Sequence, residues 1–183
     1  MDKFGNKTLQ LLAENKEIFD TKDEINVGFE NTLSELFRNP VFLGFLYTWS
    51  VFEEKVTDRI FTVRKAEVKI TSIDNFANKL DFNQELNHFV SRYQSHKSLV
   101  YSLFNSNESE SEVFLEKIEK KDKNIYDNLS LMLTIVFRYR NNMFHGNKSV
   151  NEWNLYTKEF YMCISFMIKV LNIVIAEKAV KQP

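Results

Sequence analysis

The chain has 183 residues, of which 44% are hydrophobic and 14% aromatic, so it can bury the core of one domain. Its formal net charge of −1 excludes an overall basic field, and any nucleic-acid binding must depend on a local patch. Only four glycines and two prolines occur, which excludes a fold of many tight turns and favours long helices. We therefore expect a single all-α domain over residues 1–183, an antiparallel bundle of about five to seven helices.

Hydrophobic spacing predicts two amphipathic helices at the start of the chain, over about Lys3 to Phe19 and about Asp23 to Arg38. The pair Asn39-Pro40 ends the second helix, and Pro40 suits the first turn of the next one. That third helix is predicted over Val41–Phe61. Its first half is apolar nearly all round, which indicates a central place in the bundle.

The segment from Ile60 to Ile70 contains several β-branched residues and could form a strand, but no neighbouring segment offers a partner, so we expect a helix. Helices follow over about Ser72 to Phe104, with a break allowed within this range, and over about Ser109 to Lys121. Two long helices, over about Lys123 to Phe144 and about Asn151 to Lys181, complete the predicted bundle.

Cysteine content and hydropathy bound the location of the protein. The single cysteine, Cys163, lies in the apolar run YMCISFMIKV and excludes a disulfide framework and a cysteine-rich metal site. The first residues lack the features of a signal peptide. The most hydrophobic segment, Tyr161 to Ala176, is interrupted by polar residues and is shorter than the roughly 20 apolar residues of a membrane span. We therefore expect a cytoplasmic protein that binds no membrane.

The penultimate predicted helix ends in a group of polar residues, in the segment FRYRNNMFHGNK. At about 100° per residue, its apolar side contains Met132, Ile135, Val136, Tyr139 and Met143. The opposite side carries Arg138, Asn141, Asn142 and His145. Such a stripe is usually a solvated face, but this one contains no lysine or glutamate. No acidic residue occurs between Asn128 and Asn151, so the segment, with Lys148, indicates a local basic patch.

Gly146 suits the position at which this helix ends, because glycine adopts the left-handed conformation readily. His145 then lies in the last turn, where the helix dipole favours the imidazolium. On an ideal helix Arg140 points roughly 140° away from His145. The two can meet only if the helix ends before His145 or if they act across a subunit interface.

The segment Arg140-Asn141-Asn142-Met143-Phe144-His145 resembles the R-x4-6-H motif of the HEPN superfamily, with asparagine directly after the arginine and glycine directly after the histidine. HEPN proteins are compact helical bundles, and many are metal-independent ribonucleases. The resemblance, to Apea-like or toxin and defence-type members, implies an endoribonuclease without metal or other cofactor, active in bacterial defence or a toxin–antitoxin system. Trp49 and Glu53, one turn apart, resemble the aromatic and acidic pair that some HEPN groups carry beside the site.

Metal-independent cleavage of RNA uses the neighbouring 2'-hydroxyl as nucleophile and leaves a 2',3'-cyclic phosphate. It needs a base, an acid and a cation for the charged phosphorane. Histidine titrates near neutrality and arginine matches phosphate oxygens, so His145 and Arg140 suit these roles. One histidine cannot be base and acid at once. We therefore predict a homodimer in which two copies of both residues form a composite site on the two-fold axis.

Neighbouring residues are assigned supporting roles. Asn141 is expected to orient the histidine or to hold a phosphate, and the RNA backbone is expected to contact Arg138, Asn142 and Lys148. Tyr139 could stack on a base, although its angular position favours burial. Arg92 and His96 lie one helical turn apart, but no metal-binding motif accompanies them, so we interpret them as surface residues and expect no metal site.

Two other functions stay open at this point. The first is a non-catalytic HEPN module that binds RNA, a nucleotide or a protein such as an antitoxin or regulator, with the same residues as a phosphate site. The second is a scaffold that dimerises through the apolar last helix, with an interface containing Phe166, Val170 and Val174.

Overall fold

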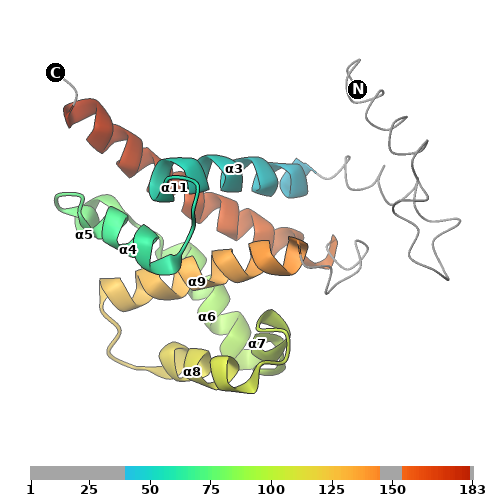
Figure 1. The fold of residues 1–183 in the computed structure, drawn as a ribbon. Helices are drawn as coiled ribbons and strands as arrows, with labels where there is room; N and C mark the ends of the chain where they lie inside the picture. The colour runs from blue at the N-terminus through green and yellow to red at the C-terminus, as the bar shows by residue number, and fades with distance from the viewer. Residues whose placement is uncertain (1–39, 145–153, 182–183) are drawn as a thin grey trace, which may run out of the picture. The chain divides into compact units, whose positions relative to one another are not determined.

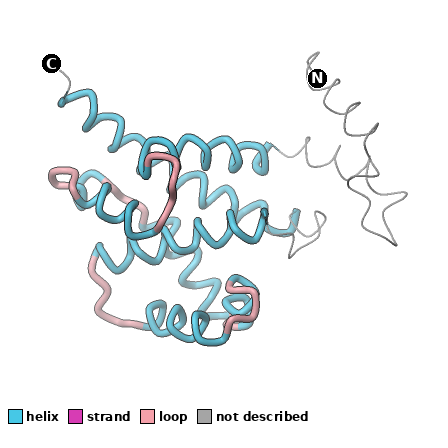
Figure 2. The backbone as a smooth tube through the Cα atoms, viewed as in Figure 1, coloured by secondary structure: helices cyan, strands magenta, loops and turns pink. Residues whose placement is uncertain are grey.

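The computed structural model of the protein describes residues 40–144 and 154–181, and this part of the chain is all-α, as predicted (Figure 1). Figure 2 shows helices joined by loops, with no strand among the described residues. The two helices predicted before Pro40 lie outside the described residues. The described residues from 41 onward belong to one compact unit, and the organisation of 1–183 as one domain stays a prediction.

The described elements follow the predicted order along the chain. They are α3 Pro40–Thr57, α4 Val63–Thr71, α5 Phe76–Lys79, α6 Asn83–Ser95, α7 Ser98–Leu103, α8 Glu108–Glu119, α9 Ile125–Phe144, the 3-10 helix η2 Asn154–Tyr156 and α11 Thr157–Lys181. In Figure 1, α9 runs in the opposite direction to α3 and α11. The break allowed within residues 72–104 is confirmed, because three separate helices occupy that range.

The boundary between α3 and α4 differs from the prediction. The helix predicted to reach Phe61 ends at Thr57, because Asp58 and Arg59 adopt φ angles of 58° and 69°, which a right-handed helix cannot contain. Thr62 is extended, and its side chain accepts a hydrogen bond from the backbone N–H of Lys65 at 3.1 Å, which caps the start of α4. The helical interpretation is therefore confirmed for Val63–Thr71.

The central helix of the bundle is α9, which packs against α4, α7, α8 and α11. Its middle turns are buried on several sides, with Leu129, Met132, Leu133, Ile135 and Val136 at most 1% exposed. The prediction that α3 is central is wrong: α3 buries one face, and its Tyr47 is 75% exposed on the other. An apolar composition did not distinguish the two helices: among the described residues, α9 packs closely against four helices, whereas α3 keeps an exposed face.

The last helix, α11, contributes mainly to the core of its own chain. Phe166, Val170 and Val174 are at most 1% exposed, so the dimer interface predicted for the scaffold function is wrong for these residues. The segment Thr157–Ala179 is long and apolar enough to cross a membrane, which corrects our expectation that it is too short, but half of the apolar window within it is buried in the protein. A core helix has the same properties, so the cytoplasmic location stays a prediction.

A buried ion pair joins α6 to α11. Glu85 is 1% exposed and accepts hydrogen bonds from Ser165 Oγ at 2.5 Å and from Lys169 Nζ at 2.8 Å. The buried carboxylate has lost its hydration, and the hydrogen bonds from these two donors offset the free-energy cost of that desolvation. This explains why polar residues interrupt the apolar sequence of α11.

We predict that Lys169→Met lowers the free energy of unfolding by about 2 kcal/mol, because it leaves the buried Glu85 carboxylate with Ser165 as its remaining side-chain donor. Urea denaturation followed by circular dichroism measures the change. The double variant Glu85→Leu/Lys169→Met removes both charges and should lose less than the sum of the two single variants. Simple additivity of the three measurements would show that the pair is not coupled.

Candidate functional site

The motif arginine lies near the C-terminal end of α9. Arg140 is half-buried, and its Nη1 donates a hydrogen bond to Asn141 Oδ1 at 3.1 Å. Its guanidinium carbon lies 5.7 Å from the centre of the Trp49 ring on α3. We call Arg140, Asn141 and Trp49 the Arg140 site. The two contacts hold the guanidinium on an aromatic face and beside an amide. The side chain therefore loses less conformational entropy when it binds an anion.

Trp49 connects this site to the core. It is 4% exposed, and its ring lies 4.8 Å from that of Phe61 and 6.1 Å from that of Phe52. Only the resemblance to HEPN proteins predicted Trp49 beside the site, and in the structure its ring does lie next to Arg140. Glu53, the other member of the predicted pair, forms no ion pair with any described residue, so its supporting role stays a prediction.

Asn142 has a different position from the one predicted. It is 4% exposed, and its Nδ2 donates a hydrogen bond to the carbonyl oxygen of Leu103, at the end of α7, at 3.0 Å. Its Oδ1 is also buried. The cavity beside Asn142 measures about 20 Å³, which is room for one water molecule and not for a nucleotide. This corrects the expectation that Asn142 lies on an exposed stripe and binds RNA: the side chain joins two helices.

Arg138 lies over the Phe104 ring, with its guanidinium carbon 4.4 Å from the ring centre, and forms an ion pair with Glu110 of α8. The segment around Arg138 lacks acidic residues in sequence, but α8 supplies one in space. The local basic patch expected from the sequence is therefore partly neutralised at this point. RNA contact by Arg138 stays a prediction, and it would have to compete with Glu110.

The remaining predicted site residues divide into two groups. His145 and Lys148 lie outside the described residues, so the distance between His145 and Arg140 stays open. Tyr139 is 5% exposed and accepts a hydrogen bond from the Tyr93 hydroxyl at 3.5 Å, which confirms its burial. Burial raises the pKa of Tyr139 and of Tyr93, so both phenols stay neutral and belong to the core.

A buried carboxylate, Glu159, lies at the start of α11, and no motif in the sequence indicates it. Its side chain is 4% exposed and lies 3.0 Å from Arg92 Nη1 and 3.5 Å from His88 Nε2, both on α6. Arg92 also lies over the Tyr156 ring, at 5.7 Å. Arg92 is therefore a half-buried, paired residue at the surface, whereas His96 is exposed as expected. Such partners lie in different helices, and spacing along one helix cannot reveal them.

Burial lowers the pKa of His88 below its ordinary value, and the nearby Glu159 carboxylate offsets this only in part. Lys158 and Arg92 lower the pKa of His88 further. The imidazole is therefore neutral near pH 7. Among the described residues, no group of three or more His, Cys, Asp or Glu side chains could hold a metal ion.

Comparisons of the chain with protein-family models, with curated proteins and with solved structures find no match. The resemblance to the HEPN superfamily therefore depends on the motif and its position alone.

We predict that Asn142→Ala lowers the free energy of unfolding by about 1–3 kcal/mol, because the buried Leu103 carbonyl loses its donor. Asn141→Ala is the matched control. It removes the same amide from the preceding residue, which is half-buried, and should lower the free energy of unfolding less. Urea denaturation of both variants provides the comparison. Equal stability of Asn142→Ala and the unmodified chain would contradict a structural role.

We also predict that His88 makes the fold less stable as the pH falls below about 6.5, its ordinary pKa. The unfolded chain then binds a proton that the folded chain binds only at lower pH, so protonation favours unfolding. His88→Asn should lessen the loss of stability between about pH 7.5 and 5.5. The exposed His96→Asn is the control and should keep the full loss. The same pH dependence in both variants would refute the role of His88.

Proposed function

We propose that the chain is a HEPN-type, metal-independent endoribonuclease that works as a homodimer in the cytoplasm. The observation that carries the proposal is the RNNMFHG segment, whose residues 140–144 end α9 in a chain whose described part is all helical. The position of Arg140 over Trp49 supports it, because a cation held by an aromatic ring and an amide is partly preorganised for a phosphate. Bacterial defence or a toxin–antitoxin system is the proposed setting.

In the proposed reaction, the 2'-oxygen of the substrate forms a bond to phosphorus while the bond from phosphorus to the 5'-oxygen breaks. His145 of one subunit takes the proton of the 2'-hydroxyl, and His145 of a second copy gives a proton to the leaving 5'-oxygen. Arg140 neutralises the charge that develops on the non-bridging oxygens. The products are a 2',3'-cyclic phosphate and a 5'-hydroxyl.

One observation favours a second candidate function, a non-catalytic HEPN module that binds RNA, a nucleotide or a protein partner. Arg138 is paired with Glu110, and Asn142 is bonded to Leu103, so two residues expected to hold RNA are engaged within the chain. Both functions use Arg140, and only cleavage separates them.

We predict that the purified protein cleaves single-stranded RNA in the presence of a chelator, and that His145→Ala and Arg140→Ala each lower the rate by about 10²-fold or more. Arg140→Lys should recover little activity, because an ammonium cannot bind two phosphate oxygens in a planar fork. The rate is measured on a labelled oligonucleotide by gel analysis, with product ends identified by mass spectrometry.

His96→Ala, a substitution of an exposed histidine, is the control and should keep full activity. Circular dichroism and the mass of the assembly in solution establish that each variant still folds and forms a dimer. Cleavage that survives both substitutions would overturn the nuclease assignment. Binding of RNA and of its 2'-deoxy analogue without cleavage of either would support the non-catalytic module instead.

A further inference from the structure

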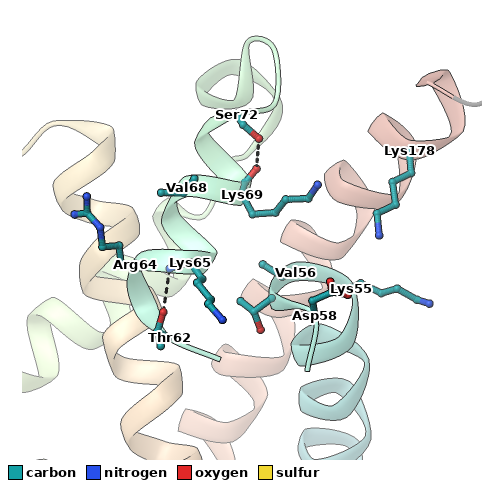
Figure 3. Close-up of a pocket in the computed structure, with 11 residues that line it drawn as sticks. Lys55, Val56, Asp58, Thr62, Arg64, Lys65, Val68, Lys69, Ser72 and Lys178 are labelled. Carbon is teal, nitrogen blue, oxygen red and sulfur yellow. Dashed lines mark hydrogen bonds between the residues drawn. The ribbon is translucent and has the colours of Figure 1, made fainter. Parts of the chain in front are cut away.

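A groove of about 710 Å³ lies between the end of α3, α4 and the C-terminal part of α11 (Figure 3). Five basic side chains line it, and one acidic side chain, Asp58, accompanies them. The basic residues are Lys55, Arg64, Lys65, Lys69 and Lys178. The whole chain has a formal net charge of −1, so this concentration of positive charge is local.

The amphipathic pattern of α4 explains why three of the five basic side chains lie on one side of the groove. Ala66 and Ile70 are fully buried and fix the inner face of the helix. Arg64, Lys65 and Lys69 then lie on the outer side. A basic outer face is ordinarily just solvated, but here a second element, α11, adds Lys178 across the groove. Like charges that face one another disfavour the fold unless an anion compensates for them.

Most cations of the groove form no ion pair with the described residues, although Lys55 and, more weakly, Lys178 lower the pKa of the exposed Glu54 carboxyl beside them. Lys55 forms an ion pair with Glu54 at 2.7 Å, whereas Arg64, Lys65, Lys69 and Lys178 form none with the described part of the chain. Figure 3 shows Lys69 pointing from α4 toward α11, Lys65 pointing toward the end of α3 and Lys178 pointing from α11 toward the end of α3, whereas Arg64 points away to the other side of α4. Lys65, Lys69 and Lys178 therefore border the same groove from two helices.

We propose that this groove binds the phosphodiester backbone of single-stranded nucleic acid. The cations are mostly lysines, which act as point charges and tolerate phosphates at varied angles. No aromatic side chain is among the lining residues, so the groove offers no platform for base stacking. Binding is therefore independent of base sequence and of the 2'-hydroxyl, and it depends strongly on salt.

The shape of the site favours a flexible strand over the other polyanionic partner, a membrane. A single strand can enter a groove between three helices. A flat lipid surface can contact only the residues at the edge of the groove. Free phosphate is a poor match as well, because the cations are spread over three helices and no buried set of donors converges on one point. A strand with several phosphates bridges α4 and α11 and compensates several of these charges together.

The position of the groove relates it to the Arg140 site. Phe61 directly precedes the capping residue of α4, and its ring contacts Trp49 at 4.8 Å, while Trp49 lies under Arg140 at 5.7 Å. The same turn of chain thus borders both features. The inference nevertheless concerns binding alone, and a DNA strand, which has no 2'-hydroxyl to attack, tests it whether or not the protein cleaves RNA.

The test measures fluorescence anisotropy of a labelled single-stranded DNA of about 12 nucleotides with the full chain. Lys65→Gln/Lys69→Gln should weaken binding about tenfold at about 0.1 M salt and lower the slope of log K against log salt by about 1.4, for two lost phosphate contacts. Lys178→Gln should weaken binding by a smaller factor. The control, Lys117→Gln/Lys121→Gln, removes the same charge from exposed positions elsewhere and should leave affinity and slope unchanged.

Three outcomes would overturn the inference. The first is affinity unchanged in Lys65→Gln/Lys69→Gln, and the second is an equal loss in the control, which would indicate net charge alone. The third is a groove variant that still binds DNA but no longer binds another anion. That anion would be a vesicle containing phosphatidylserine, or inorganic phosphate. The substituted lysines are exposed or half-buried at the surface, so circular dichroism should show a native fold in every variant.

Discussion

The burial of α9 on several sides is the constraint on which the rest of the structure depends. Four helices pack against it, so a polar side chain in its last turns must find a partner within the protein or leave the core. Asn142 bonds to Leu103, Arg138 pairs with Glu110 over Phe104, and Arg140 lies between Asn141 and Trp49. The polar end of α9 therefore combines structural and candidate functional groups, and composition alone cannot separate them.

Much of the fold follows from local chemistry. Apolar spacing predicted the helices from α3 onward, and the scarcity of glycine and proline predicted an all-α class, which is confirmed. The end of α3 was not predictable, because aspartate is only moderately enriched in left-handed backbone and arginine, at Arg59, is not. The central place of α9 was equally hidden, since it depends on how many neighbours a helix has and not on its own composition.

The candidate site shows the same division between local and distant information. The angular position of Tyr139 predicted its burial correctly, because a single helix fixes that angle. The partners of Asn142 and Arg138 lie 39 and 28 residues away in sequence, so no periodicity could indicate them. A segment without acidic residues can therefore still lie beside an acidic side chain from another helix, as Arg138 lies beside Glu110. The same reasoning applies to Glu159, whose partners are on α6.

Charge is arranged in space rather than along the chain, and this bears on how RNA would approach the protein. The positive charge expected near Arg138 is partly neutralised by α8, whereas α4 and α11 bring together lysines more than a hundred residues apart. A strand guided by such a groove would meet the protein through its phosphates first, without base recognition. Selection among RNAs would then fall to the geometry around Arg140, where an attacking 2'-oxygen must align with the leaving oxygen. In the proposed nuclease, a guanidinium held by Trp49 would favour one orientation of the phosphate, and the core of α3 would then set the direction from which a substrate reacts.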